Sequence, residues 1–252
     1  MRGFRELDRI LRGEATAAPT LSRDGLSAVP LGPLFAVNVV LAAWYGVCMG
    51  VFGLSGREEP EWRFMVADAV KVPLLFLLTL VVTFPSLYVF NALVGSRLGV
   101  KDLARLMAAA VGVIVAVLAA FGTIVAFFSV TTTTYPFILL LNVAVFSLAA
   151  GLGVVFLLRT LESLAAPPTR PAEVLTEGTP APQPLPKPPT ADTNAKRVFW
   201  AWLVVFALVG AQMSWVLRPF IGTPAKEFAW FRPREGSFFE GVLKSLRTLF
   251  GG

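Results

Sequence analysis

Three of the arginines that follow the last long apolar run of the chain stand next to a proline. Arg218 precedes Pro219, and Arg232 and Arg234 flank a second proline. Guanidinium groups bind phosphate and carboxylate oxygens in a bidentate way, so these arginines are candidate contacts for an anion or a phospholipid headgroup. A simpler role is anchoring, because an arginine beside a membrane span reaches the headgroups, Trp215 marks the boundary and a proline ends the helix.

Residues for catalysis are scarce. The chain has no histidine and one cysteine, Cys48, which excludes Cys/His zinc sites, a disulfide within the chain and every catalytic triad with a histidine base. Asp68 could flank a headgroup together with Arg218 and Arg232 in a membrane enzyme, but no motif joins the three. We therefore expect no enzyme, and we assign no catalytic residue, metal or cofactor.

Neutral polar side chains occur inside the apolar runs. Asn91, Asn142 and Gln212 are candidate intramembrane polar contacts, either between helices or with a substrate in a cavity. Pro85 predicts a kink in the second run, because proline removes a backbone donor. Asp68 stands just before that run, and no run has a charge near its middle, which disfavours an ion pump.

These side chains must be positioned by membrane helices. Hydrophobic residues make up 56% of the 252 residues and charged residues 15%, against about 25% charged in soluble domains. The apolar residues form runs of about 20, the length that crosses a bilayer as a helix. We predict an all-α polytopic membrane helix bundle with five transmembrane helices and two interfacial amphipathic helices. The five spans cover residues 34–54, 72–94, 106–129, 137–158 and 198–217.

The two ends of the chain predict those amphipathic helices. In residues 1–13, apolar side chains form one helical stripe among four arginines, a pattern suited to an anionic membrane surface. In residues 237–252, apolar residues recur at helical spacing, and Ser237 and Glu240 fit a capping box. We expect the second helix to lie on the membrane or against the bundle.

Proline-rich and charged segments divide the chain further. The segment 161–196 is rich in proline and predicts a disordered cytoplasmic linker, which could also carry a peptide-binding motif. Thirteen of the 22 lysines and arginines lie on one side if the N-terminus is cytoplasmic, which favours a cytoplasmic N-terminus and a C-terminus on the far side. A re-entrant fifth segment would instead put the tail inside. The expected regions are an amphipathic helix and linker (1–32), a four-span bundle (33–160), the linker (161–196), the fifth span (197–218) and an interfacial tail (219–252).

Small residues indicate how the helices associate. Gly46 and Gly50 have GxxxG spacing, and a ladder of small residues that includes Gly112 runs along the third span. Both patterns let helix backbones approach closely, within one chain or between chains. The expected partners are the lipid bilayer and a second copy or another membrane protein. No aromatic-lined basic face indicates nucleic acid.

Two segments carry a family resemblance. "KVPLLFLLTLVVTFPSLYVFNALVGSRL" (71–98) and "GAQMSWVLRPFIGTP" (210–224) resemble signature segments of a bacterial family of uncharacterised multi-pass membrane proteins, and "EFAWFRPREGSFFE" (227–240) resembles its tail. Some members carry the label of actin-binding WH2-domain proteins, but that motif is absent here. The span number and orientation are also similar to membrane-trafficking proteins of the Yip1 type. Neither family implies a catalytic residue.

Two functions remain open on this basis. The first is a non-enzymatic scaffold or accessory subunit of a complex in the cell inner (cytoplasmic) membrane. The second is a transporter or channel for a small or lipid-like solute, built around the second span kinked at Pro85, with Asn91, Asn142 and Gln212 around a cavity.

Overall fold

Apolar runs of this length form helices because a bilayer offers no partner for the backbone except the helix's own carbonyls. The computed structural model describes residues 2–15, 20, 29–54, 61–93, 99–165, 193–218, 220–222, 227–232 and 236–250, with backbone only at 90–93, 162, 164–165 and 193–199. The described helices are α1 (Arg2–Leu11), α3 (Leu31–Gly50), a 3₁₀ turn η2 (Val51–Gly53), α4 (Arg63–Leu93), α5 (Val100–Thr131), α6 (Tyr135–Ala165), α7 (Thr193–Val216) and α8 (Phe238–Phe250). The all-α prediction is confirmed for this part of the chain.

Four helices are long and apolar enough to cross a membrane, namely Leu31–Gly53, Arg63–Val89, Val100–Thr131 and Tyr135–Leu161. They correspond to the first four predicted spans and indicate a membrane location. The described apolar part of the fifth predicted span, Trp200–Val216, is shorter than these four. Its crossing of the membrane stays a prediction. Of the predicted linker 161–196, residues 161–165 belong to α6 and residues 193–196 to α7, whereas residues 166–192 lie outside the described residues.

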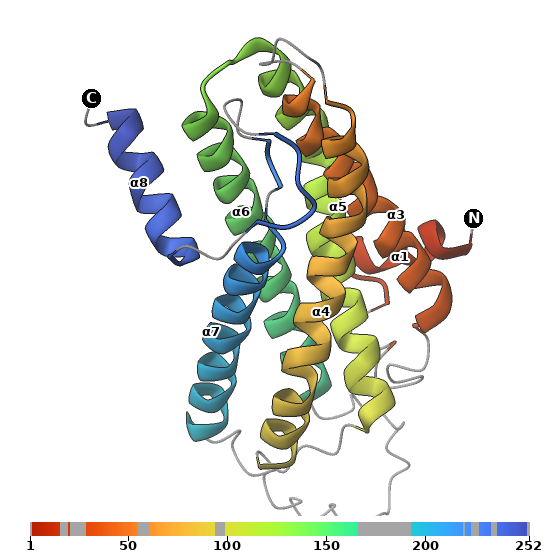
Figure 1. Cartoon of the computed structure of the whole chain (residues 1–252). Coiled ribbons are helices and arrows are strands. Elements are labelled where there is room, and N and C mark those ends of the chain that lie inside the picture. Colours follow the sequence, from red (N-terminus) through yellow and green to blue (C-terminus); the bar gives the residue numbers. More distant parts are fainter. Residues whose placement is uncertain are drawn as a thin grey trace, which may run out of the picture.

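The four long helices pack side by side, with α3 between α4 and α5 and with α6 against α5 (Figure 1). The GxxxG spacing on α3 allows a close contact between two helices of the same chain. A Cβ at Gly46 would overlap the backbone of Asp68, and one at Gly50 would overlap the backbone of Met65, so the α3 and α4 backbones touch at both glycines. Gly112 of α5 likewise lies against the side chains of Leu34 and Asn38 on α3.

The second predicted span is longer than the sequence indicated. Helix α4 begins at Arg63, one and a half to two turns before Asp68 and Lys71, rather than near residue 72. Both charged residues therefore belong to the candidate span Arg63–Val89 instead of preceding it. The helix continues through Pro85, while Thr83 and Ser86 donate their hydroxyls to carbonyls one turn earlier.

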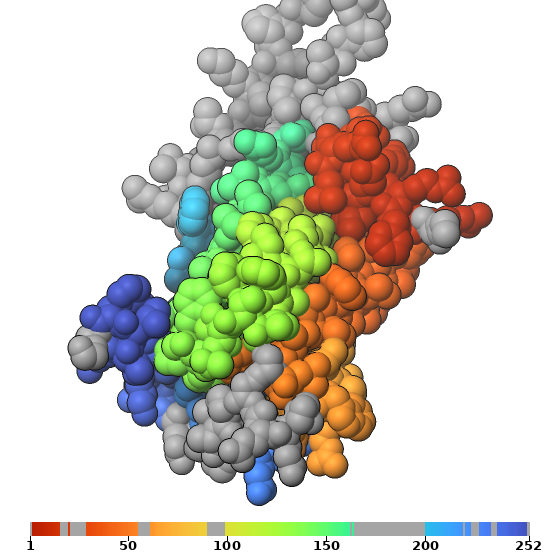
Figure 2. Space-filling model, turned by 90° about the horizontal axis from the view of Figure 1, so that it is seen from above, coloured from red at the N-terminus to blue at the C-terminus, as the bar shows by residue number. Residues whose placement is uncertain are grey.

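The two amphipathic helices lie on opposite sides of the molecule, as the view from above shows (Figure 2). Helix α1 buries Leu7 and Ile10 against α3 and α5. Helix α8 packs beside α6 and the end of α7. The predicted capping box is confirmed, because the Ser237 amide donates to Glu240 Oε2 at 3.2 Å and the Glu240 amide donates to Ser237 Oγ at 3.4 Å.

Candidate functional site

The chain turns back over α4 directly after α7. Helix α7 ends at Val216, next to the Arg218–Pro219 pair, as the sequence predicts, although Pro219 itself lies outside the described residues. Phe220 and Ile221 then pack against the cluster of core residues that includes Val72 of α4. Further along, the Phe228 ring meets the edge of Phe64, with 5.1 Å between centroids. Aromatic residues of the returning segment thus cover the first turns of α4.

Two of the three candidate arginines come together in this segment. The Arg232 amide donates to the Arg218 carbonyl at 3.3 Å, which pairs the two backbones. The Arg218 guanidinium stacks on Trp215, 4.1 Å from the ring centroid, and Arg232 Nη2 donates to the Glu227 carbonyl at 3.1 Å. Arg234 lies outside the described residues.

A third cation, Lys71, lies next to these arginines. The sequence analysis did not include it among the candidate anion contacts. Lys71 of α4 is only 2% exposed, and its Nζ lies 5.9 Å from the Phe220 centroid and 5.5 Å from the Phe231 centroid. Both distances fall within the range of cation–π attraction. Arg232 also acts on Lys71 electrostatically. Nothing in the local sequence around Lys71 indicates that the tail covers this residue.

Asp68 is the most unusual residue of this region. Its side chain is 0% exposed, and neither carboxylate oxygen has a hydrogen-bond partner in the described structure. Its neighbours one turn away on the same helix face, Phe64 and Val72, are also 0% exposed, and Lys71 interacts with it electrostatically. A buried charge without donors costs several kcal/mol unless it is paired or neutralised. Ionisable groups inside membrane spans mark candidate functional sites for that reason.

The candidate intramembrane amides have different surroundings. Asn142 is buried and fully used, because its Nδ2 donates to the Ile138 carbonyl at 2.8 Å and its Oδ1 accepts from the Tyr45 hydroxyl at 2.8 Å. Gln212 is exposed on α7, and its side chain forms no hydrogen bond with any described residue. The Asn91 side chain lies outside the described residues. Of the two amides that the structure describes, Asn142 is therefore buried between helices, whereas Gln212 faces outward.

Metal ligands do not gather in the described part of the chain: no group of three or more Cys, Asp or Glu side chains there could hold an ion. Cys48 is a buried free thiol that lies beside Gly122 of α5. Cys48 therefore serves helix packing in this structure.

The four long apolar helices fit the class of helical membrane proteins. No protein-family model, curated protein or solved structure matches the chain. The resemblance to a bacterial membrane-protein family thus stays an expectation from sequence, and the function must be argued from the residues themselves.

Proposed function

We propose that this chain is a non-enzymatic integral membrane protein, a scaffold or accessory subunit that acts by binding another membrane helix. In this proposal it lies in the cell inner membrane with a cytoplasmic N-terminus and a C-terminus on the far side, as the distribution of lysine and arginine favours. The observation that carries the proposal is the outward face of α7, and above all Gln212.

Helix α7 packs mainly on α4 and touches α8 at its end. Its opposite face is apolar and open, with Val204 54% and Leu208 46% exposed. Gln212 follows Leu208 by one turn on this face and is exposed as well. We call these three residues, with Val205, the α7 outer face.

Gln212 lies at the depth of the middle of the bundle. A Cβ at the neighbouring Gly210 would lie 3.7 Å from Thr79 Cγ2, and Thr79 is near the centre of α4. In Figure 1 the end of α7 likewise lies beside the middle part of α4. An amide that faces lipid at this depth lacks partners, and glutamine in such a position typically hydrogen-bonds to another helix.

The other deep amide supports this interpretation by contrast. The Asn142 amide oxygen accepts a hydrogen bond from Tyr45, and its amide nitrogen donates to a carbonyl of its own helix. Asn142 therefore contributes to holding α3 and α6 together. Gln212 has no such partner among the described residues. A second helix that offers a donor and an acceptor would satisfy it, and the flanking valine and leucine side chains would pack against that helix.

The test is the mass of the purified full chain in mild detergent, measured by size-exclusion chromatography with light scattering. We expect a complex larger than the 27.2 kDa single chain, and we expect Gln212→Leu to weaken it about threefold, the effect of one interhelical hydrogen bond. Ser147→Ala is the matched control, because Ser147 is exposed on α6 but donates to its own helix. A lone monomer, or equal effects of both variants, would contradict the proposal.

A second candidate function is transport of a small solute, which the buried Asp68 favours. A buried carboxylate inside a candidate span, with Lys71 near it and no hydrogen-bond donor among the described residues, is typical of solute or proton pathways. Flux into liposomes should then occur with the wild-type chain and fall sharply in Asp68→Asn, because the substitution removes the ionisable group. Asp102→Asn is the control, because Asp102 is paired with Arg105 outside the core. Absence of flux in the wild type would exclude this function.

A further inference from the structure

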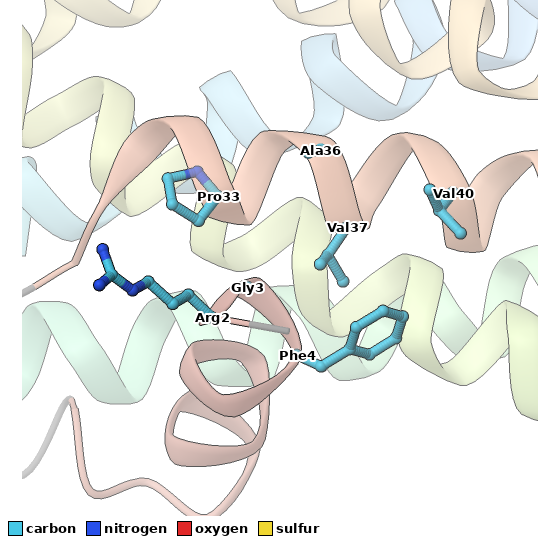
Figure 3. Close-up of a pocket in the computed structure, with 7 residues that line it drawn as sticks. All are labelled: Arg2, Gly3, Phe4, Pro33, Ala36, Val37 and Val40. Carbon is cyan, nitrogen blue, oxygen red and sulfur yellow. The ribbon is translucent and has the colours of Figure 1, made fainter.

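Helix α1 and the start of α3 form the two walls of an open groove on the outside of the bundle. The space measures about 390 Å³. Arg2 and Phe4 come from α1, while Pro33, Val37 and Val40 come from α3 (Figure 3). One wall of the groove belongs to the candidate span Leu31–Gly53, so the lipid bilayer is the medium that covers it.

The groove has a polar end and an apolar end. Arg2 extends beside Pro33, close to the first residue of α3, whereas Phe4 points toward Val40 further along the helix (Figure 3). Pro33 and Val40 are separated by about 10 Å along the helix axis at 1.5 Å per residue. Phe4 is 52% and Val40 56% exposed. A cation near the span's end and apolar surface deeper in the bilayer match the two parts of a phospholipid.

The arginines of α1 that form no ion pair with a described residue lie at the same end of the helix as the polar end of the groove. Arg9 pairs with Glu6 at 3.1 Å and Arg12 pairs with Asp8 at 2.9 Å. Arg2 and Arg5 form no ion pair or hydrogen bond with any described residue. The uncompensated positive charge of the helix therefore lies in its first turn, where the groove begins.

We propose that this groove binds one anionic phospholipid, with its phosphate at the Arg2 guanidinium and an acyl chain along Phe4, Val37 and Val40. Guanidinium binds phosphate oxygens through charge-assisted hydrogen bonds. Arg5 adds positive potential within a Debye length, which favours a net negative headgroup over a zwitterionic one. The acyl chain gains contact with apolar walls that both helices supply. The bound lipid would join α1 to α3.

Lipid binding to the purified full chain can be measured by native mass spectrometry with phosphatidylglycerol and, separately, phosphatidylcholine. We expect phosphatidylglycerol to bind more tightly, and Arg2→Gln to lower its affinity about fivefold, the contribution of one cation at a lipid surface. Arg12→Gln is the matched control, because Arg12 is already paired with Asp8. Equal affinities for the two lipids, or equal effects of the two variants, would overturn the proposal.

The apolar end needs a separate variant. Val40→Trp should fill the groove and lower the affinity for both lipids severalfold. Val39→Trp is the control, because Val39 is also exposed on α3 but does not line the groove. Unchanged binding in Val40→Trp, or the same loss in Val39→Trp, would overturn the assignment of the acyl chain.

Discussion

Single polar residues inside this bundle differ in how their hydrogen-bonding groups are used. Tyr45 and Asn142 form a buried pair that joins α3 to α6, at 2.8 Å between the hydroxyl and the amide oxygen. Trp202 of α7 donates to Ser86 Oγ on α4 at 3.1 Å and joins another pair of helices. Asp68, in contrast, is buried and has no hydrogen-bond donor among the described residues. Some of the deep polar side chains thus form hydrogen bonds between helices. Asp68 and Gln212 form no such bond among the described residues, and for this reason they point to a function.

The Tyr45–Asn142 pair yields a stability prediction. Tyr45→Phe removes the hydroxyl and leaves Asn142 Oδ1 without its donor, so we expect the free energy of unfolding to fall by about 1 kcal/mol. Tyr88→Phe is the matched control, because Tyr88 is 47% exposed and should leave stability unchanged. Denaturation in detergent by urea or heat measures both. Equal stability of the two variants would show that the pair does not form.

At the scale of helices, two glycines determine how closely α3 approaches α4. Gly46 faces the backbone of Asp68, and Gly50 faces the backbone of Met65. The two glycines are four residues apart on α3, and the residues that they face are three residues apart on α4. This contact places Asp68 at the α3–α4 interface, while the segment after α7 covers Lys71 from outside. The close approach of two helices therefore contributes to the burial of the candidate site.

Substituting glycine on two helices tests this arrangement. Gly46→Ala should lower the free energy of unfolding by about 1–3 kcal/mol, because the new methyl group overlaps backbone atoms of α4. Gly151→Ala on α6 is the control, since nothing lies within 4 Å of its Cβ position. Alanine favours a helix over glycine by about 1 kcal/mol, so the control should be neutral or stabilised. The opposite order of stabilities would contradict the close approach of α3 and α4.

At the scale of the molecule, the described residues combine a packed bundle of four long helices with a more peripheral α7 and two amphipathic helices on opposite sides (Figure 2). The α7 outer face is open to a partner helix, whereas the α1–α3 groove is open to lipid. These surfaces lie on different elements, so the tests of Gln212 and of Arg2 are independent. Failure of one proposal would leave the other standing.

The sequence by itself determined the helical class, the approximate positions of the first four spans, the end of α7 just before Arg218 and the capping box at Ser237. These features depend on local patterns: apolar length, a proline after a charge, and the spacing of a serine and a glutamate. Only the tertiary structure decided that Asp68 is buried, that the tail joins Arg218 to Arg232 beside Lys71, and that Gln212 faces outward. Burial depends on which helix faces pack together, and residues far apart in the chain supply those faces.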